Sequence, residues 1–318
     1  MILSGRYTQS FLLLLLILTG ISLATATARH PYSVTRFMQQ TRLKKKSLQG
    51  MDIIQNRIFV MQDGGFCRVY DYRTKLLLDS FPLASCRPGN HCNTANFGIE
   101  KAKGSSLPVM YVSVGKPGDT DEYACYVESF TCHKGHYQAN LVQTIRMDQS
   151  GFRQKGWQTI WGCPNWVIDK ERRHLWAFSA VKRTVVKETG PFHNNKYVAT
   201  KFRLPLLKEG KEVILTAHDV LDQAVMEFDA YVTQGGTMKD GKIYYVFGFG
   251  KEGTRTPAKM RIYDTDSRTI LARWNLEDIV KEEPEDVAVY QGRIYMNTNS
   301  PTIYVLDPFH NGFRPINP

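Results

Sequence analysis

A polar cluster early in the chain combines side chains that could bind or transform a ligand. The segment Asn90–Asn96 (NHCNTAN) places one imidazole, His91, among the amides of Asn90, Asn93 and Asn96. Histidine exchanges protons near neutral pH, so His91 could act as a general base or as a polar contact to a sugar. In a structural interpretation, the amides cap tight turns and His91 bonds to a neighbouring carbonyl. Spacing fixes no second catalytic group, so both interpretations stay open.

Acidic residues elsewhere could complete a catalytic pair with one another or with His91. Glu285 and Asp286 are adjacent, and either could face Glu100 or Asp52 across a central channel. Glycoside hydrolysis uses two facing carboxyl groups of this kind. Acidic pairs at strand starts are also common as solvated turn residues, which is the structural alternative. Such carboxylates could instead hold a central Ca²⁺, and we expect no other cofactor or metal.

Aromatic and amide side chains supply candidates for ligand binding. Four tryptophans, Trp157, Trp161, Trp166 and Trp176, lie close in sequence and could form a platform for stacking sugars or pack between repeated units. Trp161 and Trp166 are the less constrained of these. No nucleophile-elbow, zinc-protease, P-loop or dinucleotide fingerprint occurs. The predicted ligand-binding residues are Asn90, His91, Asn93, Asn96, Trp161, Trp166 and Gln234.

The elements that must position these residues repeat along the chain. A short strand with an aromatic centre returns five times, at separations of 52, 65, 68 and 51 residues, with centres at Phe59, Tyr111, Trp176, Tyr244 and Tyr295. Hairpin turn residues lie between strands at Asp63-Gly64-Gly65, Asp240-Gly241 and Gln291-Gly292. Five four-stranded units of this length predict an all-β fold, a five-bladed β-propeller. A sixth blade hidden in residues 154–220 and an irregular β-sandwich are the alternatives.

The two ends of the chain are expected to meet in the last blade. The fifth unit has only eleven residues after Asp307, so it lacks an outer strand of its own. The alternating segment Tyr32–Phe37 could supply that strand by pairing with Ile303–Leu306. Residues 213–216 are the expected outer strand of the third unit, and residues 216–226 and 276–282 are expected to form short helical connections. Ligands of propellers usually bind on the loops that enter the innermost strands, which places the predicted site at one mouth of the channel.

The first 28 residues are typical of a secretory signal peptide. Arg6 precedes an apolar run, Phe11–Leu18, and small residues follow at Ala24–Ala28. The apolar run is much shorter than the roughly 20 residues that span a bilayer, which disfavours a membrane anchor. We therefore expect an exported protein, periplasmic or extracellular, with a lead-in over residues 29–48, one domain over residues 49–318 and no later membrane span.

The charge balance is basic, with a net charge of +11 that becomes +10 when Arg6 is removed. A basic exported protein could meet an acidic glycan, an anionic surface or nucleic acid. The only dense run is Arg42–Lys46, and no nucleic-acid-binding motif is present, so we expect no nucleic-acid partner. We expect a monomer whose partner is a glycan or a cell-surface component.

Six cysteines agree with an oxidising compartment. Cys125 and Cys132 flank an expected hairpin end, and Cys86 and Cys92 bracket a tight loop, so these are the two preferred disulfides. Cys67 and Cys163 remain, either as a pair between blades or as buried thiols. A metal site at Cys132, His133 and His136 is disfavoured, because the paired spacing of structural zinc sites is missing.

The chain resembles a group of exported bacterial β-propeller proteins of uncharacterised role in its leader and in the segments QGMDIIQNRIFV, NHCNTANFGIE and YVFGFG. The segment GNHCNTANFGIE is also similar to the G-H-x-x…E stretch of helveticin-like propellers, although Asn90-His91 stands where that pattern has Gly-His. Neither resemblance implies a catalytic residue. Two functions follow as hypotheses: a module that binds a glycan or surface partner, and a carbohydrate-active hydrolase or lyase that uses His91 with mouth carboxylates.

Overall fold

Short strands make up nearly all of the part of the chain that the computed structural model describes, residues 32–40, 48–114, 118, 120–183, 195–227, 233–250 and 257–308. The chain divides into two units, Met1–Ser33 with Pro308–Pro315, and Val34–Asp307 with Ile316–Pro318; the second contains the sheets. The expected signal peptide and the basic run at residues 42–46 lie outside the described residues. Within the described residues, no helix is long and apolar enough to cross a membrane.

The strands form five sheets, each an antiparallel meander apart from one added parallel strand. Blade one holds β2 (Leu48–Ile54), β3 (Arg57–Gln62), β4 (Phe66–Asp71) and β5 (Leu77–Pro82). Blade two holds β6 (Ala95–Phe97), β7 (Met110–Ser113), β8 (Ala124–His133) and β9 (His136–Met147). Blade three holds β10 (Asn165–Asp169), β11 (His174–Ala180), β12 (Lys196–Arg203) and β14 (Val220–Glu227). Blade four holds β15 (Thr233–Lys239), β16 (Lys242–Phe247), β17 (Lys259–Asp264) and β18 (Thr269–Asn275).

Blade five joins the two ends of the chain. It holds β19 (Pro284–Tyr290), β20 (Arg293–Thr298) and β21 (Thr302–Pro308), with β1 (Tyr32–Gln39) as its outer strand. Phe37 of β1 packs edge-on against Tyr295, with the ring centroids 4.9 Å apart. The backbone N–H of Gln40 donates to the carbonyl of Pro301 at 2.5 Å. The predicted ring closure by an N-terminal strand is therefore confirmed.

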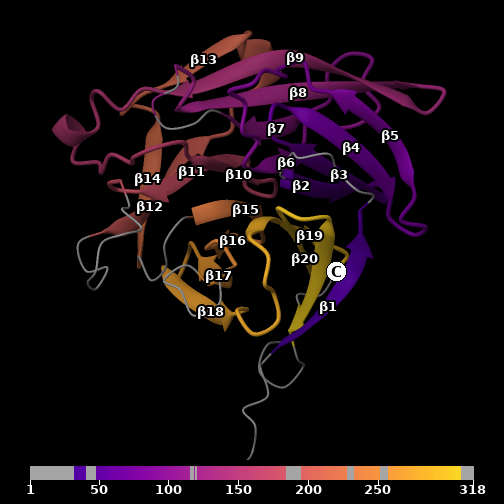
Figure 1. Ribbon diagram of the computed structural model, residues 1–318. Helices are drawn as coiled ribbons and strands as arrows, with labels where there is room; N and C mark the ends of the chain where they lie inside the picture. Colours follow the sequence, from indigo (N-terminus) through magenta and orange to yellow (C-terminus); the bar gives the residue numbers. More distant parts are fainter. Residues whose placement is uncertain are drawn as a thin grey trace, which may run out of the picture. The chain divides into compact units, whose positions relative to one another are not determined.

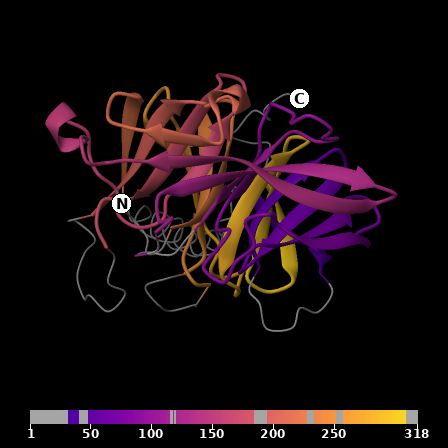
Figure 2. The ribbon, with the colours of Figure 1, turned by 90° about the horizontal axis from the view of Figure 1, so that it is seen from above.

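The five sheets form a ring around the innermost strands β2, β6, β10, β15 and β19 (Figure 1). Each of these strands contacts the innermost strands of both neighbouring blades. The fold is thus the predicted five-bladed β-propeller, and the described residues form neither a sixth blade nor a sandwich. Figure 2 shows the long β8–β9 hairpin of blade two beside blade one, where β9 contacts β5.

Two-residue turns set the register of the hairpins. Both residues of the Gln55-Asn56, Asp240-Gly241 and Gln291-Gly292 turns have positive φ, between 49° and 73°. This geometry matches the right-handed twist of the flanking strands, and glycine and asparagine tolerate it best. Two of these turns were predicted from their Asp-Gly and Gln-Gly dipeptides.

One aromatic side chain per blade is buried at the centre of the second strand. All five predicted residues are no more than 2% exposed: Phe59, Tyr111, Trp176, Tyr244 and Tyr295. Phe59 lies edge-on to Phe97 of blade two, with the ring centroids 5.0 Å apart. Tyr245 of blade four belongs to a buried apolar cluster that it shares with blade three. Successive residues of a strand face opposite sides of the sheet, so Tyr244 lies on the side of β16 that faces away from blade three. The aromatic repeat thus reflects packing between neighbouring blades.

Blade three departs from the sequence prediction in its outer half. The segment expected as its outer strand is β13 (Glu212–Leu215), which pairs in parallel with β9 of blade two (Figure 1). The outer strand is instead β14, in a segment expected to be helical. The edge of β12 offers this segment a full ladder of backbone hydrogen bonds. The free energy of these bonds outweighs the weak local preference of the segment for a helix. The other expected helical segment forms one turn, in which Val280 N–H donates to the carbonyl of Leu276 at 2.7 Å.

The preferred disulfides are not formed, because Cys86, Cys92, Cys125 and Cys132 carry free thiols. Cys125 and Cys132 lie on the same strand, β8, seven residues apart. At roughly 3.3 Å per residue their Cα atoms are far beyond the 7 Å limit for a disulfide. The Cys92 thiol is buried and instead donates to Asn90 Oδ1 at 3.0 Å.

Removal of the closing strand tests its contribution to stability. Deletion of residues 29–38 should lower the melting temperature and favour aggregation, because β21 becomes an exposed edge. Each lost hydrogen bond is worth roughly 1 kcal/mol net, and each kcal/mol lowers the melting temperature of a large domain by about 2–4 °C. Thermal unfolding followed by circular dichroism measures the change. A truncated chain that melts like a chain beginning at residue 29 would show that β1 does not stabilise the ring.

Candidate functional site

The predicted site residues gather where the innermost strands begin, which we call the proximal face; the opposite side is the distal face. His91 and Asn93 precede β6, Trp161 precedes β10, and all three are half-buried with part of each side chain open to solvent. Alternate strands run in opposite directions, so the ends of the second strands share the proximal face with these loops. Asp63, which follows β3, therefore lies on the same face as His91.

A ring of hydrogen bonds joins neighbouring blades just inside the proximal face. Most of these bonds connect a side-chain amide to a backbone or side-chain oxygen of the adjacent blade. In order around the ring they are Gly50 N to Cys92 O at 2.8 Å, Asn93 Nδ2 and Thr94 Oγ1 to Asn165 Oδ1 at 2.8 Å each, Asn165 Nδ2 to Gln234 O at 2.6 Å, Gln234 Nε2 to Glu283 Oε1 at 2.6 Å, and Asn297 Nδ2 to Gln49 O at 2.7 Å.

Further hydrogen bonds cross the axis and fill the centre of the ring. Asn96 of blade two donates to the carbonyl of Gly236 in blade four at 3.2 Å, and accepts from Thr237 Oγ1 at 2.8 Å. Blades two and four are not neighbours, so these bonds span the middle of the propeller. The side chain of Asn96 is 1% exposed, which leaves it no surface for a ligand.

Asp286 connects three blades through one buried carboxylate. Its Oδ2 accepts from the backbone N–H groups of Met51 at 2.8 Å and Ala95 at 3.2 Å, and Oδ1 accepts from its neighbour Val287 at 2.9 Å. Complete burial raises the pKa of Asp286 well above its usual range, although these three donors favour the charged form. Asp286 therefore supports the backbone, and does not present a free oxygen to a substrate.

Asp52 likewise accepts hydrogen bonds from backbone N–H groups, at a position nearer the distal face. Its Oδ2 accepts from Phe97 N–H and its Oδ1 from Ile53 N–H, both at 2.7 Å. Burial raises the pKa of Asp52, while the charge of Lys170, 3.9 Å away, acts in the opposite direction. Ala95 and Phe97 are alternate residues of β6, so their backbone N–H groups point to the same, inner edge of that strand. Asp286 and Asp52 together accept hydrogen bonds from both of these N–H groups.

Glycines allow the innermost strands to approach this closely. A Cβ atom at Gly50 would lie 2.7 Å from the carbonyl oxygen of Cys92, and one at Gly236 would lie 2.7 Å from the carbonyl oxygen of Tyr244. A Cβ at Gly235 would overlap the carboxylate of Asp286. The polar centre thus requires glycine at these positions.

Glu285 is also largely buried among the central polar groups. It is 2% exposed, and its carboxyl oxygens are not among the fully buried side-chain oxygens of the described residues that lack a hydrogen-bond partner. Burial, with the neighbouring charges of Glu283, Asp63 and Asp286, raises its pKa well above the usual value. Burial thus favours the protonated, uncharged form of the Glu285 carboxyl group.

His91 forms a pair with an aspartate that the sequence prediction treated only as a turn residue. Its Nδ1 lies 2.5 Å from Asp63 Oδ1, and each side chain is 33% exposed. A carboxylate on Nδ1 orients the imidazole and directs Nε2 elsewhere, as in acid–base catalytic pairs. The only sequence signal for Asp63 was its place in the Asp-Gly-Gly turn that faces the His91 loop.

The remaining predicted residues are structural in their contacts. Asn90 is buried and donates to the carbonyl of Ser85 at 3.0 Å, and Gln234 belongs to the inter-blade ring. Trp166 is 0% exposed, so its indole packs within the core and offers no face to solvent. Glu100 follows β6 and accepts from Leu207 N–H at 3.0 Å, at the end of the strand opposite to His91. The structure thus brings together His91, Asn93 and Trp161 on one face, and excludes Glu100 from it.

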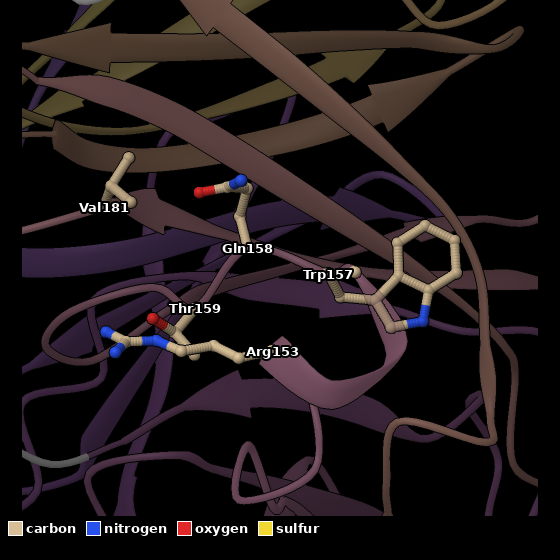
Figure 3. A pocket seen from close by; sticks show the side chains of 6 residues that line it. Arg153, Trp157, Gln158, Thr159 and Val181 are labelled. Atoms are coloured by element: carbon tan, nitrogen blue, oxygen red, sulfur yellow. The ribbon is translucent and has the colours of Figure 1, made fainter.

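A pocket of about 400 Å³ lies beside residues 153–159, which precede β10 (Figure 3). It is lined by Arg153, Gly156, Trp157, Gln158, Thr159 and Val181. The backbone of Gln158 is fixed by Gln223, which accepts from its N–H and donates to its carbonyl, both at 2.9 Å. Val181 follows β11, whose end lies at the proximal face, so one side of the pocket reaches the face that holds His91 and Trp161, while Gln158 lies against the outer strand β14 of blade three. It combines an indole, a guanidinium, an amide and a hydroxyl group.

Among the described residues, no group of three or more His, Cys, Asp or Glu side chains is placed to hold a metal ion. The central Ca²⁺ remains a prediction without a ligand set.

No protein-family model and no curated protein matches this chain. Similar solved structures include the glutaminyl cyclase of Myxococcus xanthus, at 12% identity and a TM-score of 0.46 over 86% of this chain and 96% of that one. Raptor of Chaetomium thermophilum is 10% identical, with a TM-score of 0.41 over 85% of this chain and only 20% of its own length. The WD40 domain of Neurospora crassa Pan2 is 8% identical, with a TM-score of 0.36, covering 85% and 65% respectively. These matches concern the fold and carry no functional argument, and they support neither export nor the helveticin resemblance.

The role of Asp286 can be tested with Asp286→Asn. The amide nitrogen cannot accept from the backbone N–H groups that Asp286 now binds, and a buried unsatisfied group costs about 1–3 kcal/mol. We expect the urea midpoint to fall accordingly. The exposed Asp278→Asn is the matched control and should unfold like the wild type. Equal midpoints for the two variants would contradict the assigned role.

The buried acid Glu285 predicts a pH-dependent difference in stability. Its raised folded pKa means that its contribution is fully present below the unfolded pKa, about 4.3, and is lost as pH rises through the folded value. Glu285→Gln should therefore gain stability relative to the wild type as pH rises from about 4.5 to 8. Denaturant unfolding of both proteins across this range measures the difference. A difference that stays constant with pH would show that Glu285 has an ordinary pKa.

Proposed function

We propose that the protein is a binding module that takes a glycan or a cell-surface component on its proximal face. The accessible predicted residues on this face are an imidazole, an amide and an indole, from His91, Asn93 and Trp161. Sugars present apolar C–H faces and many hydroxyl groups, so they are bound by aromatic rings together with amides and charged donors.

The observation that carries this proposal is the pocket beside Trp157. Its volume of about 400 Å³ lies within the range of small-ligand sites, roughly 300–1,000 Å³. Arg153, Gln158 and Thr159 supply donors and acceptors around it. Figure 3 shows the side chains of Arg153, Thr159 and Trp157 among those that line this pocket. A saccharide that extends from this pocket along the proximal face would meet Trp161 next.

The burial of the central carboxyl groups favours a binding function over glycoside hydrolysis. Glu285 and Asp286 are both at least 98% buried, and the oxygens of Asp286 already accept from backbone donors. Glycoside hydrolysis needs two carboxyl groups, roughly 5–9.5 Å apart, on either side of an accessible substrate. Because both carboxyl groups are buried, neither Glu285 nor Asp286 can contact a substrate in this way.

The alternative function is a carbohydrate-active hydrolase or lyase. The contact between His91 and Asp63 favours it, because an oriented imidazole at a half-exposed position can remove or deliver a proton. For either activity we propose, from the leader-like first 28 residues, that the protein acts outside the cytoplasm, in the periplasm or beyond the cell, as a monomer.

Substitution of Trp157 tests the binding proposal. Trp157→Ala should weaken binding of a glycan identified by array screening by roughly tenfold or more, since a stacked aromatic ring is worth about 1–3 kcal/mol. Trp157→Phe keeps a ring face and should retain part of the affinity. Leu221→Ala, at an exposed position on the outer strand of blade three, is the surface control. The proposal fails if no glycan of a broad array binds, or if Trp157→Ala binds as well as the control.

Product analysis separates the two functions. Incubation with polysaccharides, followed by assays for reducing ends and unsaturated products, should show no turnover by a binding module. The matched histidine variants are His91→Ala and His136→Ala, the latter 84% exposed in the β8–β9 hairpin. Turnover that disappears only in His91→Ala would replace the binding proposal with the enzymatic one.

A further inference from the structure

The pocket in Figure 3 has a wall, residues 157–160, whose backbone is fixed by two glutamine side chains. Gln223 of β14 accepts from the N–H of Gln158 and donates to its carbonyl, both at 2.9 Å. Gln149 does the same at Ile160, accepting at 2.7 Å and donating at 3.1 Å. This wall is therefore positioned before any ligand arrives, which lowers the entropy cost of binding.

The polar side chains that line the pocket, by contrast, make no hydrogen bond to any residue that the structure describes. They belong to Arg153 and Gln158, which are exposed, and to Thr159, which is half-buried. A guanidinium group carries only donors, whereas an amide and a hydroxyl group can each donate and accept. These groups are free to bind a ligand without breaking a contact within the described part of the protein.

Arg153 is the only charged residue among the six that line the pocket. Other surface arginines pair with carboxylates, as Arg203 does with Glu209 at 2.7 Å and Arg172 with Asp266 at 2.6 Å. No carboxylate of the described residues pairs with Arg153 in this way. A pocket whose one charge is an unpaired guanidinium favours a negatively charged ligand.

The residues next to the lining residues in the chain are also cationic. Lys155 ends the 3₁₀ turn that Arg153 begins, and Lys182 and Arg183 follow Val181; all three cations are exposed. None of the three pairs with a described carboxylate. Salt at about 0.15 M screens charges beyond about 8 Å, so adjacent cations act on the pocket more strongly than distant carboxylates do.

We propose that this pocket binds the negatively charged group of an acidic saccharide, and that this group is the carboxylate of a uronic acid. A planar carboxylate matches the guanidinium fork of Arg153 with two parallel N–H···O bonds, whereas the oxygens of a sulfate ester are arranged tetrahedrally. The indole of Trp157 would pack against the C–H face of the sugar ring, and Gln158 and Thr159 would bind its hydroxyl groups. The inference rests on the proposed function, because it names the class of glycan that the same pocket takes.

The test compares saccharides that differ only at C6 of each ring. The probes are tetragalacturonic acid, its carboxyl-reduced neutral counterpart and the 6-O-sulfated form of that counterpart, with the same series built on mannuronic and glucuronic acids. Isothermal titration of the full folded protein, at about pH 7 and 0.15 M salt, measures their affinities. At least one uronate should bind roughly tenfold more tightly than its neutral counterpart, and more tightly than its sulfated one.

Three variants locate the charge that carries this preference. Arg153→Gln should reduce the preference to less than about threefold. Arg153→Lys should keep part of it, because an ammonium group retains the charge without the planar fork. Lys155→Gln removes a charge from the same turn but outside the pocket lining, so it should keep the preference. Because Arg153 is exposed and has no described partner, Arg153→Gln should melt like the wild type, which excludes misfolding as a cause.

The outcomes separate this inference from the proposed function. Equal affinity for every uronate and its neutral counterpart, a preference that survives Arg153→Gln, or an equal loss in Lys155→Gln overturns the inference while glycan binding stands. Tighter binding of a sulfated form overturns the assignment of the charge to a carboxylate.

If no saccharide binds, the glycan proposal fails, and phenylacetate with phenylacetamide as its neutral match decides whether the pocket is an anion site. The readout is the indole N–H signal of Trp157 in the nuclear magnetic resonance spectrum of the full protein. A shift caused by phenylacetate alone, and lost in Arg153→Gln, supports the anion site. A shift caused by both compounds or by neither overturns it.

Discussion

Each of the five innermost strands pairs with a neighbour on one side only, so the backbone N–H and C=O groups of its other edge face the axis without a strand partner. The rest of the molecule depends on how these groups find hydrogen-bond partners. An unpaired N–H group in a buried position costs free energy comparable to a lost hydrogen bond. Asp286 accepts from strands β2 and β6, Asp52 accepts from β6, and Asn96 bonds across the axis to β15. Glycine at residues 50, 235 and 236 lets the strands come close enough for these bonds. The centre of this propeller is therefore a polar core and not an open passage.

This constraint also determines where chemistry can occur. Side chains that satisfy the inner edges have no oxygen or amide left for a ligand, so the useful groups lie on the loops of the proximal face. The sequence alone does not show whether an acidic residue at the start of an inner strand binds backbone or a ligand. Asp286 accepts hydrogen bonds from three backbone N–H groups, so its role is structural.

The blade architecture could be predicted because it depends on local signals that repeat. The central aromatic of each second strand marks packing against a neighbouring blade, and Asp-Gly and Gln-Gly turns fix the hairpins. The closing strand followed from the missing outer strand of the last unit. Partnerships between blades left no such local signal. Strand β13 crosses to blade two, β14 forms because β12 offers an edge, and Asp63 reaches His91 from another blade. The cysteine pairing failed because Cys125 and Cys132 share one long strand, whose length was not evident from its composition.

Neighbouring blades are joined by different kinds of contact. Blades two and three share the β9–β13 pairing, and β5 of blade one contacts β9 of blade two. Blade four meets blade three through a buried apolar cluster that includes Trp176, Tyr197 and Tyr245, and through exposed ion pairs, Arg172 with Asp266 at 2.6 Å and Arg268 with Asp222 at 2.9 Å. Exposed pairs of this kind contribute little and are screened by salt. The junction between blades three and four therefore depends on apolar packing, and a rise in ionic strength should leave it closed.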